Sequence, residues 1–154
     1  MSEEEARRLL KQAMALHSQG DIDAALAAVR QAIALAPTLG EAWSYLGSTL
    51  VMRKRQFADG LEALDRAAEL SSEDAAVYYT LGWCREFVAN ALHRPKRSRP
   101  YQPVAQDADT LYALARDAFL RALQLNPDED MRGDIEDMLD VIANATGEPW
   151  REGD

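Results

Sequence analysis

The chain has one cysteine, two histidines and few aromatic residues, which make up 7% of its 154 residues. Because Cys84 has no second cysteine to pair with, the chain cannot form an internal disulfide. Neither His17 nor His93 lies beside Cys, Asp or Glu at the spacing of a zinc site. Glycine-rich phosphate loops and nucleophile motifs are also missing. We therefore expect no metal, no cofactor and no enzymatic activity.

Transport signals are missing as well. The first residues, Met-Ser-Glu-Glu-Glu, lack the basic and apolar stretches of a secretory signal. No apolar run approaches the ~20 residues that a membrane span needs. The expected location is the cytoplasm, without membrane insertion.

Positive charge is scarce relative to negative charge. Seventeen Lys and Arg residues stand against 26 Asp and Glu residues, which gives a net charge of -9. Such a field repels phosphate backbones, so nucleic acid is not expected as a partner.

Strand-forming residues are sparse too, because much of the 47% hydrophobic fraction is alanine and Val, Ile and Thr are few. This composition favours packed helices, and we predict an all-α fold without strands.

Three segments of the chain repeat one another, beginning at Gly20, Gln56 and Asp109. Counted between aligned positions such as Ala25, Gly60 and Ala115, the copies are offset by 35 residues and then by 55. In register, Ala25, Val29, Ala32 and Leu35 correspond to Gly60, Leu64, Ala67 and Leu70, and then to Ala115, Phe119, Ala122 and Leu125. Apolar residues three and four apart share one face of a helix.

The segments before these copies also align. Leu9, Gln12 and Ala13 precede the first copy, Trp43, Leu46 and Gly47 the second, and Tyr78, Leu81 and Gly82 the third. Each copy therefore reads as a hairpin of two helices, with a small residue where the helices approach closely.

This pattern resembles the tetratricopeptide repeat, a helix-turn-helix unit of ~34 residues. The resemblance implies a right-handed α-α superhelix of three hairpins within 1–126, at about 6–37, 40–72 and 75–127, the third carrying an insertion near 91–108. The sequence departs from the repeat pattern at Gln12, Gly60, Ser72 and Arg85.

Helix boundaries and a terminal helix can also be predicted. Ser2 with Glu5, and Thr38 with Glu41, have the spacing of a capping box. Residues 127–147 are expected to form an amphipathic capping helix, followed by a tail at 148–154. Its apolar stripe is Met131, Ile135, Met138, Leu139 and Ile142.

In the resembling family, the first helices of successive hairpins line a concave surface that binds a partner. The residues predicted to line it are Leu10, Met14, His17, Ser44, Ser48, Val51, Tyr79, Trp83, Glu86 and Phe87. Tyr79 and Trp83 lie one helical turn apart, as a flat apolar wall typical of protein-binding hot spots. The alternative interpretation is that these aromatic residues are plain core.

Family members that bind acidic C-terminal tails of chaperones use Lys, Asn and Arg on these helices. This chain has Leu10, Met14, Tyr45, Ala76 and Thr80 at those places. A carboxylate there would lose water without gaining an ionic partner, so we expect a ligand with apolar anchors.

The insertion in the third copy contains the segment from His93 to Pro103, in which three prolines exclude a continuous helix. Its four cationic residues form a basic tip that could dock an acidic partner, a phosphate-bearing ligand or a second copy, or could be only a solvated loop. They are Arg94, Lys96, Arg97 and Arg99.

Together these features predict a protein–protein interaction module, an adaptor, scaffold or chaperone-like protein that binds a peptide or helix, with self-association as a related possibility. One alternative is a small-molecule carrier or enzyme with an aromatic pocket around Tyr79, Trp83 and Phe87. Another is a dedicated chaperone for secreted proteins.

Overall fold

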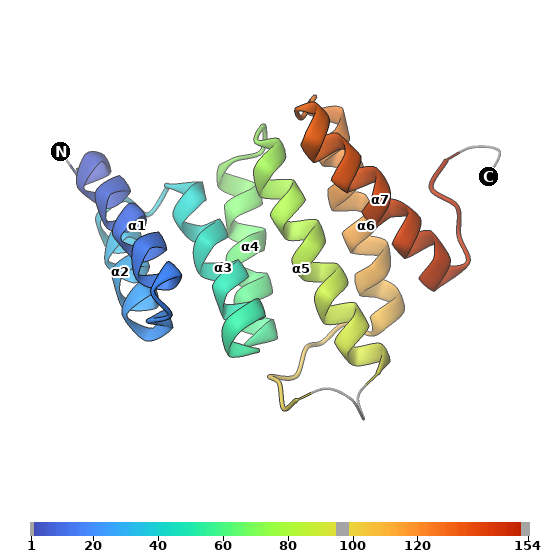
Figure 1. Ribbon diagram of the computed structural model, residues 1–154, viewed down its shortest axis with the longest axis horizontal. Coiled ribbons are helices and arrows are strands. Elements are labelled where there is room, and N and C mark those ends of the chain that lie inside the picture. The colour runs from blue at the N-terminus through green and yellow to red at the C-terminus, as the bar shows by residue number, and fades with distance from the viewer. Residues whose placement is uncertain (1, 95–98, 152–154) are drawn as a thin grey trace. The chain divides into compact units, whose positions relative to one another are not determined.

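Seven α-helices follow one another in the computed structural model, which describes residues 2–94 and 99–151 (Figure 1). No strand occurs in these two ranges, as the all-α prediction required. The helices are α1 (Ser2–Ser18), α2 (Ile22–Leu35), α3 (Gly40–Lys54), α4 (Phe57–Leu70), α5 (Ala75–His93), α6 (Ala108–Gln124) and α7 (Glu129–Thr146).

Four of these helices begin at an aspartate whose side chain accepts a hydrogen bond from the backbone of the first turn. This N-cap satisfies a backbone N–H group that has no partner within the helix. The caps are Asp21 for α2, Asp74 for α5, Asp107 for α6 and Asp128 for α7. The capping box predicted at Thr38 is wrong, because α3 has Leu39 at its N-cap and no side-chain hydrogen bond there.

The chain divides into two compact units at Ser72. Unit 1 contains two antiparallel hairpins, α1 with α2 and α3 with α4, and α2 packs on α3. In the second hairpin, the backbones of α3 and α4 lie close together because Gly47 faces Gly60. A Cβ atom on Gly47 would lie 2.7 Å from the Gly60 carbonyl oxygen. Glycine at both positions lets the two helix backbones approach each other.

Unit 2 begins at Glu73 and contains the hairpin of α5 and α6, with α7 packed on both helices. At the hairpin crossing, a Cβ atom on Gly82 would lie 2.8 Å from the ring of Phe119. Four of the five residues in the predicted apolar stripe of α7 are buried, whereas Met131 is half-buried. The four are Ile135, Met138, Leu139 and Ile142.

The repeat register predicted from the sequence is buried in every copy at its first three positions. These are Ala25, Val29 and Ala32, then Gly60, Leu64 and Ala67, then Ala115, Phe119 and Ala122. The fourth position is not part of the core, because Leu35 is 38% exposed and Leu70 and Leu125 are half-buried. It falls at the end of the second helix of each hairpin, where the helix stops.

Cys84 is buried in unit 2, and burial raises the pKa of its thiol to about 12. Since the thiolate is the reactive form, the folded chain should react only slowly with a thiol reagent such as DTNB at about pH 8. In concentrated guanidinium chloride the same thiol should react fast and completely. Equal rates in the two conditions would show that Cys84 is accessible in the native chain.

Candidate partner-binding surfaces

The first helices of the two hairpins of unit 1 are joined by an ion pair. Arg7 of α1 donates from Nη1 to Glu41 of α3 at 3.1 Å and from Nη2 to Glu3 at 3.2 Å. The hydrogen bond to Glu41 is the main reason why the pKa of Arg7 is raised. The guanidinium is thus already matched by two carboxylates of the chain itself.

A second contact joins the same two helices. The Tyr45 hydroxyl donates to the Ala13 carbonyl oxygen at 3.3 Å and lies 2.9 Å from Nδ1 of His17. Because this hydroxyl has one proton, we assign Nδ1 of His17 as the donor to its oxygen. His17, which was predicted to line the binding surface, therefore helps to hold α1 against α3. Tyr45 was not among the predicted site residues, and its role depends on a contact 28 residues away in sequence.

We call Met14, His17, Ser44 and Ser48 the α1–α3 face. Met14 is 47% exposed, and the other three side chains are half-buried. The Ser48 hydroxyl donates a hydrogen bond to the Tyr45 carbonyl oxygen at 3.2 Å, so its proton is already used within α3.

Two residues predicted for this surface are core residues instead. Leu10 is 4% exposed and belongs to the hydrophobic cluster of unit 1. Val51 is 0% exposed, and its Cγ2 atom would lie 2.5 Å from a Cβ atom on Gly60. Both side chains point into the core of unit 1, because the removal of apolar side chains from water favours this packed orientation.

Tyr79, Trp83, Glu86 and Phe87 form the α5 face, and all four are half-buried. The Tyr79 ring meets both Trp83 and Phe119 edge-to-face, with centroids 6.4 Å apart in each pair. Tyr79 donates its hydroxyl to Asp134 of α7 at 3.0 Å. Burial, with this hydrogen bond as a smaller contribution, raises the pKa of Tyr79.

The indole Nε1 of Trp83 is buried and has no hydrogen-bond partner in the described part of the chain. With this nitrogen inside and the Tyr79 hydroxyl bound to Asp134, the ring surface left in reach of a partner is mainly apolar.

Glu86 is the charged member of the α5 face. Burial raises the pKa of its carboxyl group above the ordinary value. Within residues 2–94 and 99–151, no hydrogen bond or ion pair reaches this carboxylate. Its charge is felt at Tyr112 of α6, where it is a secondary reason, after burial, for the raised pKa of that phenol.

Only two of the four residues of the predicted basic tip lie in the described part of the chain. Arg94 is the C-cap of α5 and is exposed, as is Arg99, and both residues have further interactions within the protein. Lys96 and Arg97 lie outside the described residues.

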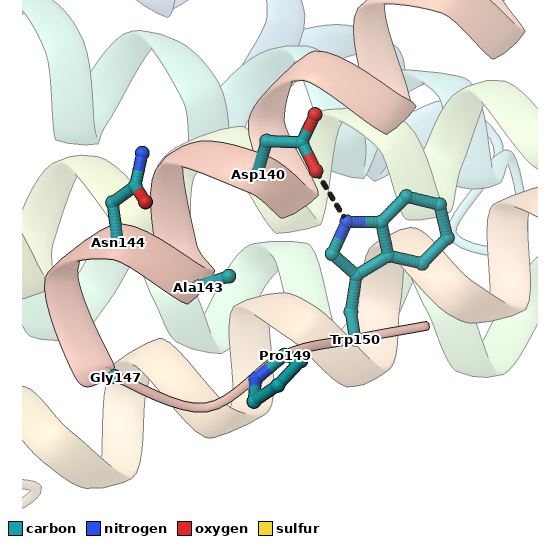
Figure 2. Close-up of a pocket in the computed structure, with 6 residues that line it drawn as sticks. All are labelled: Asp140, Ala143, Asn144, Gly147, Pro149 and Trp150. Atoms are coloured by element: carbon teal, nitrogen blue, oxygen red, sulfur yellow. Dashed lines mark hydrogen bonds between the residues drawn. The ribbon is translucent and has the colours of Figure 1, made fainter. Parts of the chain in front are cut away.

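The segment after α7 forms a feature that was not predicted. Gly147 ends the helix with φ 78°, and the chain then turns back along α7 (Figure 2). Trp150 donates its indole N–H to Asp140 at 2.7 Å, and Arg151 pairs with Glu136 at 2.5 Å. A shallow cavity of about 590 Å³ lies there, lined by Asp140, Ala143, Asn144, Gly147, Pro149 and Trp150.

The described ranges contain no group of three or more His, Cys, Asp or Glu residues that could hold a metal ion. No helix in them is long and apolar enough to cross a membrane.

Residues 6–39, which span the first hairpin, match the family model of the tetratricopeptide repeat. No curated protein sequence showed significant similarity to the chain.

Among solved structures, the chain resembles the first tetratricopeptide domain of Spaghetti (RPAP3) bound to the HSP90 peptide SRMEEVD, with 16% identity and a TM-score of 0.71 over 94% of this chain and 95% of that one. It also resembles the N-terminal domain of stress-induced protein-1 (STI-1) from C. elegans, with 18% identity and a TM-score of 0.55 over 89% and 96%. At these identities the likeness concerns the fold, which is the one that the internal repeats predicted. With a first hairpin that matches the repeat model and a fold shared with two such domains, this chain has the helical-hairpin fold of tetratricopeptide-repeat domains.

Proposed function

We propose that the chain is a non-enzymatic interaction module that binds a peptide or helix of a partner protein along the first helices of its hairpins. This is the surface that the sequence predicted as a concave groove. The α1–α3 face of unit 1 and the α5 face of unit 2 are each a candidate contact surface by itself, and an adaptor or chaperone-like role in the cytoplasm fits such a module.

The observation that carries this proposal is the half-buried aromatic row of the α5 face. Tyr79, Trp83 and Phe87 follow one another at one-turn spacing, and their exposed surface is mainly apolar. Partly exposed, rigid aromatic rings lose little conformational entropy when a partner covers them, and such residues dominate binding energy at protein interfaces.

A second support comes from the structural relatives. The Spaghetti domain, which shares this fold, was solved with a bound peptide. The fold therefore can receive a peptide, and stable specific binding requires about 1,000 Å² or more of buried surface.

The test is affinity capture from native lysate with wild type and with Trp83→Ala. We expect Trp83→Ala to lose the partner, because a central aromatic anchor typically contributes about 2 kcal/mol or more. Trp150→Ala is the matched control, since it removes the same side chain from a position outside both faces and should retain the partner. Circular dichroism must show that both variants are folded.

A variant with the four tip cations neutralised tests the remaining predicted site in the same experiment. If folded Trp83→Ala retains every captured protein, the α5 face is not the binding surface. If only the tip variant loses the partner, the basic tip is the binding site instead.

A further inference from the structure

Glu86 occupies a position that is apolar core in the preceding hairpin. The alignment that places Trp43 over Tyr78 also places Val51 over Glu86. Val51 is 0% exposed, whereas Glu86 carries a carboxylate that burial disfavours. A half-buried carboxylate without a hydrogen bond or ion pair in the described residues costs stability. Within residues 2–94 and 99–151, no contact of the fold accounts for this charge.

The neighbours of Glu86 suggest what could match it. Trp83 precedes it by three residues, on the neighbouring turn of the same helix, and Phe87 follows it directly in sequence; both side chains are half-buried. A basic side chain fits this arrangement, because its aliphatic stem can cover apolar rings while its charged head reaches a carboxylate. Arginine fits best, since its planar guanidinium also stacks on aromatic faces and binds carboxylates with two donors.

The helix that packs against α5 is also acidic. Helix α7 packs against α5, and its Asp134 accepts the hydrogen bond from Tyr79. Along its length α7 carries six acidic residues against Arg132 alone. A negative field of this kind attracts basic segments and repels acidic ones during encounter.

Arg7 of α1, which lies outside the α1–α3 face, is already paired with Glu3 and Glu41. Glu86 and the acidic helix α7 therefore disfavour, at the α5 face, an acidic peptide such as the one bound to the Spaghetti domain.

Resting on the function proposed above, we propose that the α5 face recognises a basic segment of its partner, in which an arginine or lysine reaches Glu86 and lays its stem on Trp83 and Phe87. The carboxylate then acts as the specificity-determining group, and the aromatic rings supply the apolar anchor.

Selection from a random peptide display library, using the wild-type chain, tests this proposal. We expect enrichment of peptides with Arg or Lys beside apolar residues. With a selected peptide, Glu86→Gln should weaken binding about tenfold to a hundredfold, the range expected for losing a charge-assisted hydrogen bond. Citrulline in place of the peptide's arginine should weaken wild-type binding equally, and combining both changes should cost little more.

Glu86→Gln should fold as the wild-type chain does, so that weaker binding cannot be explained by unfolding. Glutamine keeps the size of Glu86 and removes the charge that burial disfavours. A carboxyl group whose folded pKa is raised lowers stability as pH rises through that pKa, so at neutral pH Glu86→Gln should be at least as stable as wild type. Glu62→Gln, the same change at an exposed residue of α4, should leave binding unchanged.

The outcomes separate this inference from the proposed function. Selection of apolar peptides without basic residues, bound equally by Glu86→Gln but lost in Trp83→Ala, overturns the charge assignment and leaves the aromatic surface in place. If no peptide is selected, or if Trp83→Ala binds like wild type, both proposals fail. Strong coupling between Glu86 and the peptide's arginine supports both.

Discussion

Phe119→Ala should lower the free energy of unfolding by about 3–5 kcal/mol, the usual cost of emptying a buried phenylalanine site. Phe119 is 0% exposed, lies against Gly82 of α5 and meets the Tyr79 ring edge-to-face. Its loss removes the side chain that fills the space between α5 and α6. Because these helices and α7 form unit 2, the effect should be concentrated there.

Chemical denaturation followed by circular dichroism measures the loss, and hydrogen exchange locates it. Backbone protection should fall first in α5, α6 and α7. Val141→Ala is the control, because it shortens a side chain of the same unit that is 47% exposed, and it should change stability by less than about 0.5 kcal/mol. A loss below about 1 kcal/mol for Phe119→Ala would mean that this ring does not hold the hairpin together.

Gly47→Ala should destabilise unit 1 by about 1–3 kcal/mol, as overpacking of a close helix contact does. The added Cβ atom would lie 2.7 Å from the Gly60 carbonyl oxygen and 3.0 Å from the Leu64 backbone nitrogen. Both atoms belong to the backbone of α4, which cannot yield as a flexible side chain can. The two helices must therefore move apart, although alanine itself favours a helix.

Gly133→Ala separates these two effects. A Cβ atom on Gly133 of α7 would meet nothing within 4 Å. There the helix preference of alanine acts alone and should raise stability by up to about 1 kcal/mol. Thermal unfolding of the two variants should shift in opposite directions. An unchanged or raised midpoint for Gly47→Ala would show that α3 and α4 are farther apart than described here.

The pairing of the helices was predictable because the repeat can be recognised from the spacing of apolar residues within each segment. Alanine, valine and leucine at matching positions of three segments define one face per helix, and that face was found buried at Val29, Leu64 and Phe119. Gly47 and Gly82 mark close approaches in the same way, since a missing side chain is visible in a sequence. Apolar periodicity identifies such positions because burial of a helix face is what stabilises the helix.

The lining of the binding faces was less predictable. Leu10 and Val51 were expected beside Met14 on the surface, yet both point into the core. Neighbouring positions on a helix differ by 100° or less in direction, so a small rotation of the packed helix decides which of them is covered. Spacing alone does not set that rotation; the partner helix does.

The contacts that tie separate segments together had no local signal. His17 with Tyr45 and Tyr79 with Asp134 join residues 28 and 55 positions apart. Trp150 returning to Asp140 depends on the turn at Gly147.

By itself, the sequence determined that the chain is helical, where its hairpins pair and which family it resembles, because these follow from the order of large, small and polar side chains along each helix. Only the tertiary structure decided which side chains remain in reach of a partner and left the carboxylate of Glu86 half-buried. Exposure and the energy of a charge depend on every neighbouring segment at once, and those neighbours come from distant parts of the chain.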